Sequence, residues 1–256
     1  MDKIDIAGLK IDALTKARLL DAITARAKAG QKTFLTTAYS EFLYQELKDQ
    51  GVLEMLNQAD IAVADGMGIF WANKFLSTPL TFKNYWLKIL QAIWQTFWTL
   101  SLIIFKPLAL KKTIPEKIVG ADLIWDLAKL ASENNFSIYL LGGFGNTPEI
   151  AANILADFCS KTCNLQLTTY YSNKNPGDDS IIDDIKKANP DFLFVAFGPI
   201  KQEKWIMENL PNLPVKLAAG LGGTFDYIAG KRLTPPHFLR YIGIEWLWRL
   251  ITQPKR

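Results

Sequence analysis

Short apolar runs, each bounded by turn residues, recur along the 256-residue chain and alternate with segments of helical periodicity. They cover residues 33–37, 61–64, 137–143, 165–170, 191–198 and 215–220. Runs this short, rich in branched and aromatic side chains, predict buried strands rather than helices. Strands that alternate with helices favour a parallel sheet with helices packed on it. We therefore expect an α/β fold with a largely parallel, doubly wound sheet flanked by helices.

The run at residues 61–64 ends on Asp65, which Gly66 and Gly68 follow. Ligands of parallel α/β sheets bind at the carboxyl ends of the strands, where glycines let a substrate approach the backbone. Asp65 is therefore the first candidate for a working residue. The alternative is structural: Asp65 caps the helix expected from about Met67, as aspartate often does. The stretch alone does not decide between the two.

Two more strand ends carry groups suited to phosphate or sugar. Gly142 and Gly143 close a strand and precede a helix, so backbone N–H groups there can face a diphosphate, although the dinucleotide fingerprint is incomplete. Lys201 and Gln202 follow the strand at residues 191–198, where an ammonium can pair with phosphate and an amide can bond a sugar or base. A solvated helix start with charges four residues apart explains the same two side chains equally well.

Charge and composition exclude several classes of function. The formal charge of +4 fits phosphate groups or an anionic membrane surface, whereas duplex DNA usually needs a denser basic face, so no nucleic-acid partner is expected. With one histidine, Cys159 and Cys163 cannot make a four-ligand zinc site from the usual Cys and His donors. We expect these two cysteines to be buried free thiols of a protein in a reducing compartment. The N-terminus carries no apolar signal segment, so we expect the chain to begin in the cytoplasm.

Residues 89–105 contain no charged side chain and are rich in aromatic and branched apolar residues. As a helix they would span about 26 Å, slightly less than a bilayer core of about 30 Å. The flanking lysines are Lys83, Lys88, Lys106, Lys111 and Lys112. Positive charge at both ends does not choose an orientation across a membrane, but it suits a helix or hairpin in the headgroup region. The alternative is a helix buried in the core or in an oligomer interface.

The last residues, 235–256, interleave aromatic side chains with basic ones, including Arg240 and Arg249. This pattern is typical of a helix at a membrane surface or partner, or of one that packs on its own domain. The expected organisation is a Rossmann-like α/β domain at residues 1–234, with an apolar and membrane-associating insertion at about 80–112, followed by a C-terminal helical appendage. An apolar insertion or appendage can also serve a homo-oligomer.

Six motifs occur in an order typical of one enzyme family. They are Asp65-Gly66-Met67-Gly68, Gly120-Ala121-Asp122-Leu123, Leu140-Leu141-Gly142-Gly143, Phe197-Gly198-Pro199-Ile200-Lys201-Gln202-Glu203-Lys204-Trp205, Gly222-Gly223-Thr224-Phe225-Asp226-Tyr227-Ile228-Ala229-Gly230 and Gly243-Ile244-Glu245-Trp246-Leu247-Trp248-Arg249-Leu250. Together they resemble the WecG/TagA/CpsF glycosyltransferases, glycosyltransferase family 26. The resemblance covers nearly the whole chain, except about residues 78–113.

The resemblance implies an enzyme that transfers a sugar, with inversion and without a metal or other cofactor, from a UDP-sugar donor. The implied acceptor is a sugar linked to polyprenyl diphosphate, and the product belongs to a cell-envelope polysaccharide or glycolipid. Such an enzyme works on the cytoplasmic face of the cell membrane, as a peripheral or monotopic protein. N-acetylmannosamine, its uronic acid and a hexose such as glucose are all transferred within such a family, and the sequence does not separate them.

The resemblance also implies roles for single residues. Asp65 matches the general base, which takes the proton from the acceptor hydroxyl as it attacks the anomeric carbon. Thr37 matches a hydroxyl of the substrate pocket, and Gln202 matches an amide there. Arg240 and Arg249 resemble arginines that reach the acceptor or donor diphosphate once the appendage docks.

Three positions depart from the family pattern. Lys117 stands where arginine is usual, which keeps the charge but loses the bidentate fork for phosphate. Tyr39 replaces a usual asparagine, which bears on donor-sugar specificity. Thr234 stands where an arginine is usual, although Arg232 is near. These departures keep a non-catalytic nucleotide-sugar or lipid-binding module as the alternative. A nucleotide-dependent oxidoreductase is a weaker alternative, because the glycine motif at Gly142 and Gly143 is incomplete.

The order of the candidate residues limits how the apolar segment can meet a membrane. Asp65 precedes the segment, and Lys117 and Gln202 follow it. A single crossing would place them on opposite sides of the membrane, whereas one site needs all three in one compartment. We therefore expect a monotopic or re-entrant insertion rather than a transmembrane span.

Overall fold

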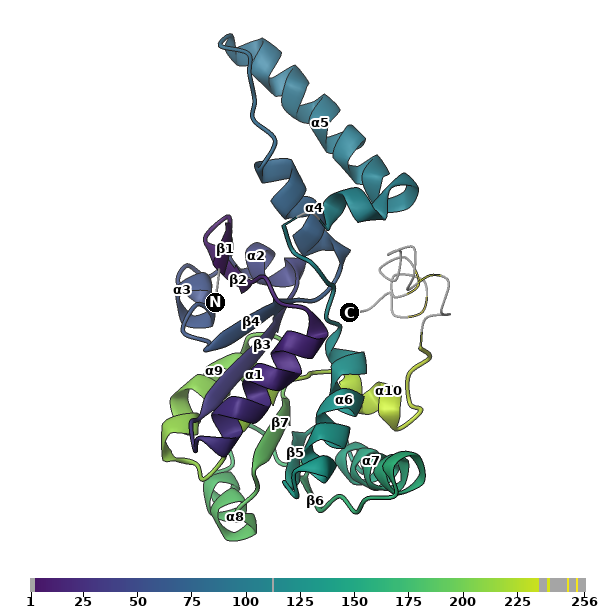
Figure 1. Ribbon diagram of the computed structural model, residues 1–256. Coiled ribbons are helices and arrows are strands. Elements are labelled where there is room, and N and C mark those ends of the chain that lie inside the picture. The colour runs from purple at the N-terminus through teal and green to yellow at the C-terminus, as the bar shows by residue number, and fades with distance from the viewer. Residues whose placement is uncertain (1–2, 112, 235–238, 240–247, 249–251, 253–256) are drawn as a thin grey trace.

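The centre of the structure is a six-stranded sheet in the order β4-β3-β8-β7-β5-β6, with every pairing parallel (Figure 1). The computed structural model describes residues 3–111, 113–234, 239, 248 and 252. The strands of this sheet are β3 (Thr33–Ala38), β4 (Ile61–Ala64), β5 (Ile138–Gly142), β6 (Thr169–Ser172), β7 (Phe192–Ala196) and β8 (Leu217–Gly220). The predicted α/β fold with a largely parallel sheet flanked by helices is confirmed.

Helices cover both faces of the sheet (Figure 1). One face carries α1 (Lys16–Lys28), α6 (Gly120–Glu133) and α7 (Thr147–Cys163), and the other carries α8 (Ser180–Ala188) and α9 (Lys201–Asn209). Successive strand residues point to opposite faces. Leu140 accordingly joins the core under α6 and α7, whereas Leu141 joins the core under α8 and α9. Burial on both faces explains why these strands are continuous apolar runs.

Two of the strand regions differ from the sequence-based expectations. The strand expected at residues 165–170 begins later, as β6, because Leu167 is buried in the core and pairing with β5 starts at the Thr168 carbonyl, which accepts from Ile138 N at 3.0 Å. The antiparallel hairpin of β1 (Lys3–Ile6) and β2 (Leu9–Asp12) is not predicted from the sequence. The shorter helices of the body are α2 (Ser40–Glu46), α3 (Val52–Leu56), α10 (Thr224–Ile228) and the 3-10 turn η2 (Leu210–Asn212).

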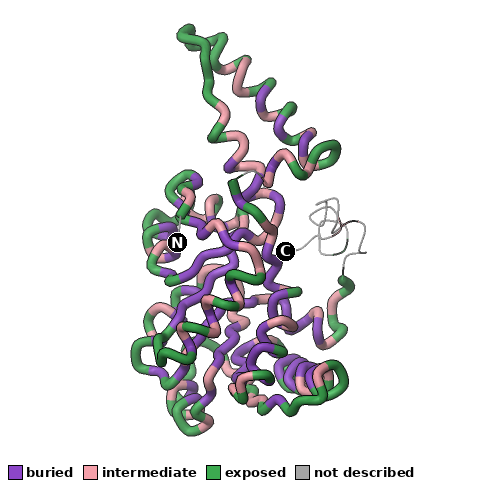
Figure 2. Tube along the Cα trace, viewed as in Figure 1, coloured by how far each residue is buried: buried purple, intermediate pink, exposed green. Residues whose placement is uncertain are grey.

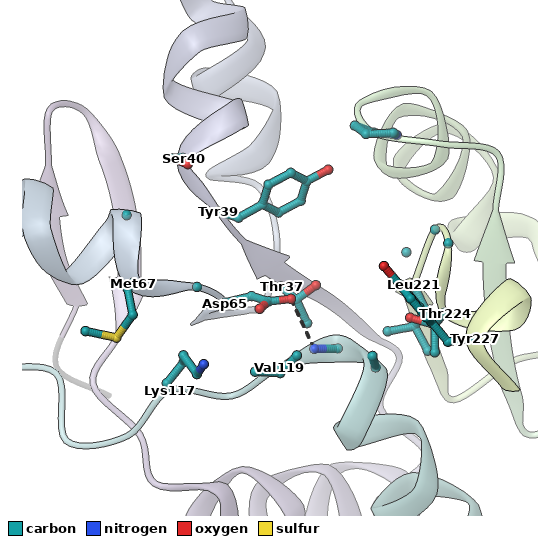
Figure 3. Close-up of a pocket in the computed structure, with 18 of the residues that line it drawn as sticks. Thr37, Tyr39, Ser40, Asp65, Met67, Lys117, Val119, Leu221, Thr224 and Tyr227 are labelled. Carbon is teal, nitrogen blue, oxygen red and sulfur yellow. Dashed lines mark hydrogen bonds between the residues drawn. The ribbon is translucent and has the colours of Figure 1, made fainter. Parts of the chain in front are cut away.

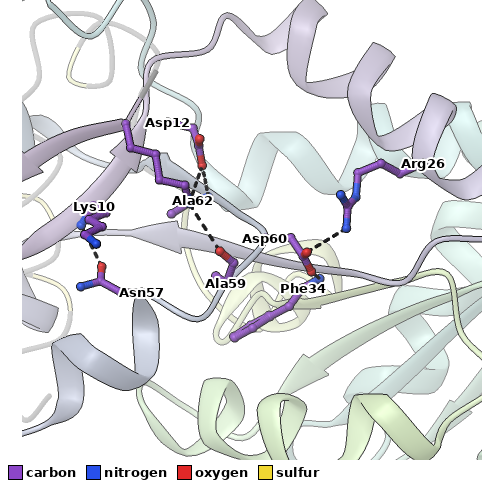
Figure 4. A network of polar contacts seen from close by, with 9 residues as sticks. Lys10, Asp12, Arg26, Phe34, Asn57, Ala59, Asp60 and Ala62 are labelled. Atoms are coloured by element: carbon purple, nitrogen blue, oxygen red, sulfur yellow. Dashed lines mark hydrogen bonds and ion pairs between the residues drawn. The ribbon is translucent and has the colours of Figure 1, made fainter. Parts of the chain in front are cut away.

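Two carboxylates bond the backbone around the start of β4, the edge strand (Figure 4). Asp12 Oδ2 accepts from Ala62 N at 2.9 Å, and Asp60 Oδ2 accepts from Phe34 N at 2.8 Å. Asp60 Oδ1 also pairs with Arg26 Nη2 at 2.8 Å. A strand-edge N–H that is bonded to a side chain is not open to pairing with another chain. The hairpin and α1 therefore hold the strand that leads to the predicted site.

A helical hairpin projects from the body of the molecule (Figure 1). It consists of α4 (Met67–Leu76) and α5 (Tyr85–Phe105), and the 3-10 turn η1 (Pro107–Leu110) follows it. Among the described residues α5 is the one helix long and apolar enough to cross a membrane, judged by length and composition, and only 17% of its most apolar window is buried. The alternative of a helix buried in the core is therefore wrong (Figure 2). The appendage expected at residues 235–256 lies outside the described residues, apart from 239, 248 and 252.

The end of β5 is crowded at Gly142. Its φ is +89°, and a Cβ added there would lie 2.7 Å from Phe197 Cδ1 and 2.9 Å from the Ala196 carbonyl oxygen. Both the backbone conformation and the close approach of β7 therefore require glycine. This packing is a structural reason for a residue that the sequence analysis assigns to substrate binding.

We expect Gly142→Ala to lower the free energy of unfolding by about 2–4 kcal/mol, because it combines a positive φ with a steric clash. Gly145→Ala is the matched control, since Gly145 also has a positive φ (+57°) but a Cβ there would meet nothing within 4 Å. The control should lose only about 1 kcal/mol. Urea unfolding of both variants measures the difference, and equal losses would show that crowding contributes nothing at Gly142.

Candidate active site

A cavity of about 360 Å³ opens at the carboxyl ends of β3, β4 and β8 (Figure 3). The strand ends supply Thr37 and Asp65, the segment before α6 supplies Lys117, and α9 supplies Gln202. Trp71 of α4 contributes to the cavity lining from the helical hairpin. The carboxyl ends of parallel strands are the usual place for a ligand in this class of fold. The sequence-based placement of the site at these strand ends is consistent with this cavity.

Strand pairing brings Thr37 and Asp65 together. Residues of β3 and β4 pair in register, with Thr37 opposite Val63, and Asp65 N donates to the Ala38 carbonyl at 2.7 Å. A Cβ built on Gly120 would lie 3.3 Å from Thr37 Oγ1 and 3.6 Å from Asp65 Oδ2, so both side chains converge on the first residue of α6. Figure 3 shows the hydroxyl and the carboxylate side by side in the cavity.

The carboxylate of Asp65 contacts the start of α6, which is a different helix from the one that the capping alternative names. The N-cap position of α4 is occupied by Gly66, which has no side chain that could bond the first N–H groups of that helix. Asp65 Oδ2 instead accepts from Gly120 N at 3.1 Å, at the start of α6. A carboxylate is stabilised at a helix N-terminus by the helix dipole and the unpaired N–H groups. α6 therefore orients Asp65 at the cavity.

A buried polar pair sets the orientation of Gln202. Its Nε2 donates to Glu203 Oε1 at 2.8 Å, and its Oε1 accepts from Gly222 N at 3.1 Å. Gly220 lies against both side chains, because a Cβ there would approach each of them within 2.7 Å. The amide is thus held by a carboxyl group on one side and by the backbone of the β8–α10 loop on the other. The amide of Gln202, predicted to belong to the pocket, therefore lies in the cavity wall, and both its nitrogen and its oxygen have a hydrogen-bond partner in the protein.

Tyr39 and Lys117, two of the positions that depart from the family pattern, also line the cavity. Tyr39 follows β3, and its ring packs against Phe42 with 4.6 Å between centroids. Lys117 lies in the segment between η1 and α6. Figure 3 places Tyr39 and Lys117 on opposite sides of the Asp65 carboxylate. These two positions therefore change the contacts of the cavity itself.

Other residues of the sequence-based site lie elsewhere or outside the described part of the chain. Gly142, Gly143 and Lys201 do not line the described cavity, although Lys201 begins α9, one residue before Gln202. Arg240 and Arg249 fall on residues whose structure is not described. Their assignment to substrate stays a prediction.

The structure adds residues that sequence reasoning does not identify. Leu100 and Ile103 of α5 line the cavity beside Trp71. They are apolar residues in an apolar helix, so nothing in the sequence distinguishes them from their neighbours. Arg232, which is near Thr234 in the sequence, pairs with Asp226 at 2.9 Å. Its Nη1 would lie 3.2 Å from a Cβ on the cavity residue Gly223.

Glu203 is a titratable group behind the cavity wall. Its side chain is fully buried, and burial raises its pKa from 4.5 to about 7, against the lowering effect of the hydrogen bond from Gln202. In the unfolded chain the carboxyl loses its proton near pH 4.5, whereas in the folded protein it keeps it to about pH 7. The contribution of this group to stability is therefore largest at low pH and decreases as the pH rises through this window.

Glu203→Gln removes this ionisation and keeps an oxygen that can accept from Gln202 Nε2. Relative to the parent protein, the variant should gain up to about 3 kcal/mol in the free energy of unfolding between pH 5 and pH 8. Urea unfolding at both pH values gives this difference. Glu208→Gln, an exposed change on the same helix, is the matched control. If the variant and the parent keep the same difference at both pH values, Glu203 does not titrate in this range.

Comparison with known families agrees with the geometry. A model described as the glycosyl transferase WecG/TagA/CpsF family matches residues 4–106 and 101–256. The matched regions together include all of residues 78–113, so the sequence-based exclusion of this segment from the resemblance is wrong. The α4–α5 hairpin is part of what the family model matches.

Similar proteins include N-acetylglucosaminyldiphosphoundecaprenol N-acetyl-beta-D-mannosaminyltransferases of Staphylococcus aureus. The protein of strain MRSA252 is 27% identical over 99% of this chain and 86% of its own length. Those of strains NCTC 8325 / PS 47 and COL match with the same identity and coverage. Because the family model matches almost the entire chain, the protein is a glycosyltransferase that belongs to the WecG/TagA/CpsF family.

Proposed function

We propose that this glycosyltransferase moves a sugar from a UDP-sugar to a polyprenyl-diphosphate-linked acceptor in the synthesis of a cell-envelope polysaccharide or glycolipid. The observation that carries the proposal is the convergence of Asp65, Thr37 and Gln202 on one cavity. The relatives are named for an N-acetylmannosaminyl transfer to N-acetylglucosaminyl diphosphoundecaprenol. N-acetylmannosamine is accordingly the first donor sugar to test, ahead of its uronic acid and a hexose.

In this reaction Asp65 is the general base. Its carboxylate takes the proton of the acceptor hydroxyl while the hydroxyl oxygen attacks the anomeric carbon, the bond from that carbon to the phosphate oxygen breaks, and the nucleoside diphosphate leaves with the electron pair. Among the described residues that line the cavity, Asp65 is the only one with a carboxylate. One carboxylate suits a single displacement, which inverts the configuration, whereas a covalent intermediate needs a second group.

The remaining cavity groups suit a diphosphate and a sugar. The ammonium of Lys117 can offset phosphate charge. Thr37 Oγ1 and the Gln202 amide can bond sugar hydroxyls. Because the acceptor carries a polyprenyl chain, the protein would work at the cytoplasmic face of the cell membrane as a peripheral or monotopic enzyme.

Asp65→Asn should lower kcat by about 10²-fold or more, because an amide cannot take the proton. The fold should persist, since the Asn side-chain oxygen can still accept from Gly120 N. Asp157→Asn is a matched control: Asp157 is exposed on α7, where it pairs with Lys161 at 2.8 Å. The measurement is acceptor-dependent release of nucleoside diphosphate, with thermal unfolding as the check on folding. Near-normal turnover of the folded Asp65→Asn variant would reject the base assignment.

A donor screen tests the proposed function as a whole. Purified protein is given a polyprenyl-diphosphate N-acetylglucosamine acceptor and a panel of UDP-sugars, and nucleoside diphosphate release is followed with and without a chelator. We expect acceptor-dependent, chelator-resistant release from one donor. Loss of activity with chelator would reject the proposed independence from metal. Donor binding without turnover on any lipid acceptor would instead favour a non-catalytic binding module.

Whether the transfer reaction depends on a metal ion is decided by this chelator test. Among the described residues no group of three or more His, Cys, Asp or Glu side chains is placed to hold a metal ion. That observation concerns the protein alone, because a metal can also enter with a diphosphate substrate. Independence from metal therefore remains part of the proposal.

A further inference from the structure

The helix α5 has its polar side chains turned toward the protein. Gln95 Nε2 donates to the carbonyl oxygens of Phe75 and Thr78 at 2.7 and 3.0 Å, and Thr99 Oγ1 accepts from Trp71 Nε1 at 2.9 Å. Gln95 and Thr99 are both buried. The two Gln95 bonds occupy carbonyls at and just beyond the C-terminal end of α4, where a helix leaves its last carbonyls without intrahelical partners. The polar face of α5 is therefore the face that packs against α4.

The opposite face of α5 is apolar and exposed (Figure 2). A stripe recurs at steps of four and three residues: Trp86, Leu90, Ile93, Phe97, Leu100 and Ile104. Their exposed fractions lie between 40% and 71%. Trp94 and Phe105 widen this stripe on one side and are 65% and 78% exposed. Monomeric soluble proteins rarely expose apolar patches that extend along a whole helix, so a partner is required.

Charge selects the chemistry of that partner. From Asp65 to Glu116 the sequence has no acidic residue between the two, whereas it has Lys74, Lys83, Lys88, Lys106, Lys111 and Lys112. A coiled-coil partner would need a narrow seam flanked by charges of both signs. The stripe of α5 is broad and aromatic, and no charged residue interrupts it from Ile89 to Phe105. Aromatic side chains with lysines at both ends match an anionic lipid surface.

The path of the chain decides how α5 meets the lipid. Asp65 precedes the hairpin and Lys117 follows it, yet both line one cavity. The chain therefore leaves and returns on the same side, and a single crossing is excluded for the structure described. The stripe runs along the whole of α5, about 31 Å at about 1.5 Å per residue. A stripe of this length favours a helix that lies in the plane of the leaflet.

The inner end of α5 joins this surface to the cavity. Leu100 belongs to the exposed stripe and also lines the cavity, together with Ile103 and Trp71. We propose that the α5 stripe binds one leaflet of an anionic bilayer in its plane, and that Leu100, Ile103 and Trp71 form the apolar entry through which the first isoprenyl units of the acceptor reach Asp65. The entry rests on the proposed function, whereas lipid binding by the stripe does not.

Vesicle binding tests the stripe without any catalysis. The full chain is mixed with vesicles of phosphatidylcholine and phosphatidylglycerol, or of phosphatidylcholine alone, and the bound fraction is measured by flotation. Leu90→Ser with Ile104→Ser should weaken partitioning to the anionic vesicles at least tenfold. The matched control is Leu47→Ser with Leu233→Ser, two exposed leucines of the body, which should change it less than twofold.

Two results would overturn lipid binding by the stripe. One is equal partitioning of the stripe variant and its control. The other is a stripe variant that binds vesicles normally but changes the mass of the protein in sedimentation without lipid, because the stripe would then be an interface between copies of this chain. Stripe tryptophans quenched by labels at the bilayer centre rather than at shallow depth would reject the in-plane orientation.

Acceptors of two lengths test the entry and keep its failure distinct from that of the proposed function. With a short-chain soluble acceptor, the Leu90→Ser and Ile104→Ser variant should stay within twofold of the parent in kcat/KM. With a full polyprenyl acceptor in vesicles it should lose tenfold or more. Leu100→Ser should impair the long acceptor in detergent more than the short one, and equal effects would reject the entry. Inactivity of the parent on every acceptor would reject the proposed function and leave the vesicle result unaffected.

Discussion

Parallel pairing of β3 with β4 sets the geometry on which the cavity depends. The register places Ala38 opposite Ala64, and the next N–H, that of Asp65, donates to the Ala38 carbonyl at 2.7 Å. A slip of one residue would turn the side chains of β4 to the opposite faces of the sheet. Asp12 and Asp60 oppose such a slip, because each carboxylate bonds a specific backbone N–H near the start of the pairing. The position of the Asp65 carboxylate thus depends on bonds that Asp12 and Asp60 make at the opposite end of this strand pair.

The α4–α5 hairpin depends on a second set of polar bonds. A helix normally packs its apolar face on the body, which would bury the stripe of α5 and expose Gln95 and Thr99. The opposite arrangement holds because the amide of Gln95 satisfies two carbonyls and Thr99 accepts from the Trp71 indole. Leaving these buried groups unpaired would cost about 1–3 kcal/mol each. The same bonds hold Trp71 in the cavity wall, so the orientation of the hairpin and the shape of the cavity are coupled.

The sequence predicts the parts of this protein that local patterns determine. Strands buried on both faces are continuous apolar runs, so the parallel sheet and the position of Asp65 at a strand end follow directly. The β1–β2 hairpin lacks such a signal. Its apolar side chains pack against residues that are distant in sequence, such as Phe42 and Phe70. The bond from Asp65 to α6 joins residues 55 positions apart, so the local pattern alone could not decide between a role in the site and capping of the nearer helix.

Burial separates residues that look alike in sequence. Glu203 and Glu208 lie on the same short helix, yet only Glu203 is buried, next to Gln202 and under Gly220. Helical spacing alone does not reveal this, because the glycine that makes room for both side chains belongs to β8. Two of the positions that depart from the family pattern, Tyr39 and Lys117, differ from Glu203 because they face the cavity directly. Both line the cavity beside Asp65 and neither belongs to a helix or strand, so they alter what the cavity contacts while the bonds that place the carboxylate stay in β3, β4 and α6.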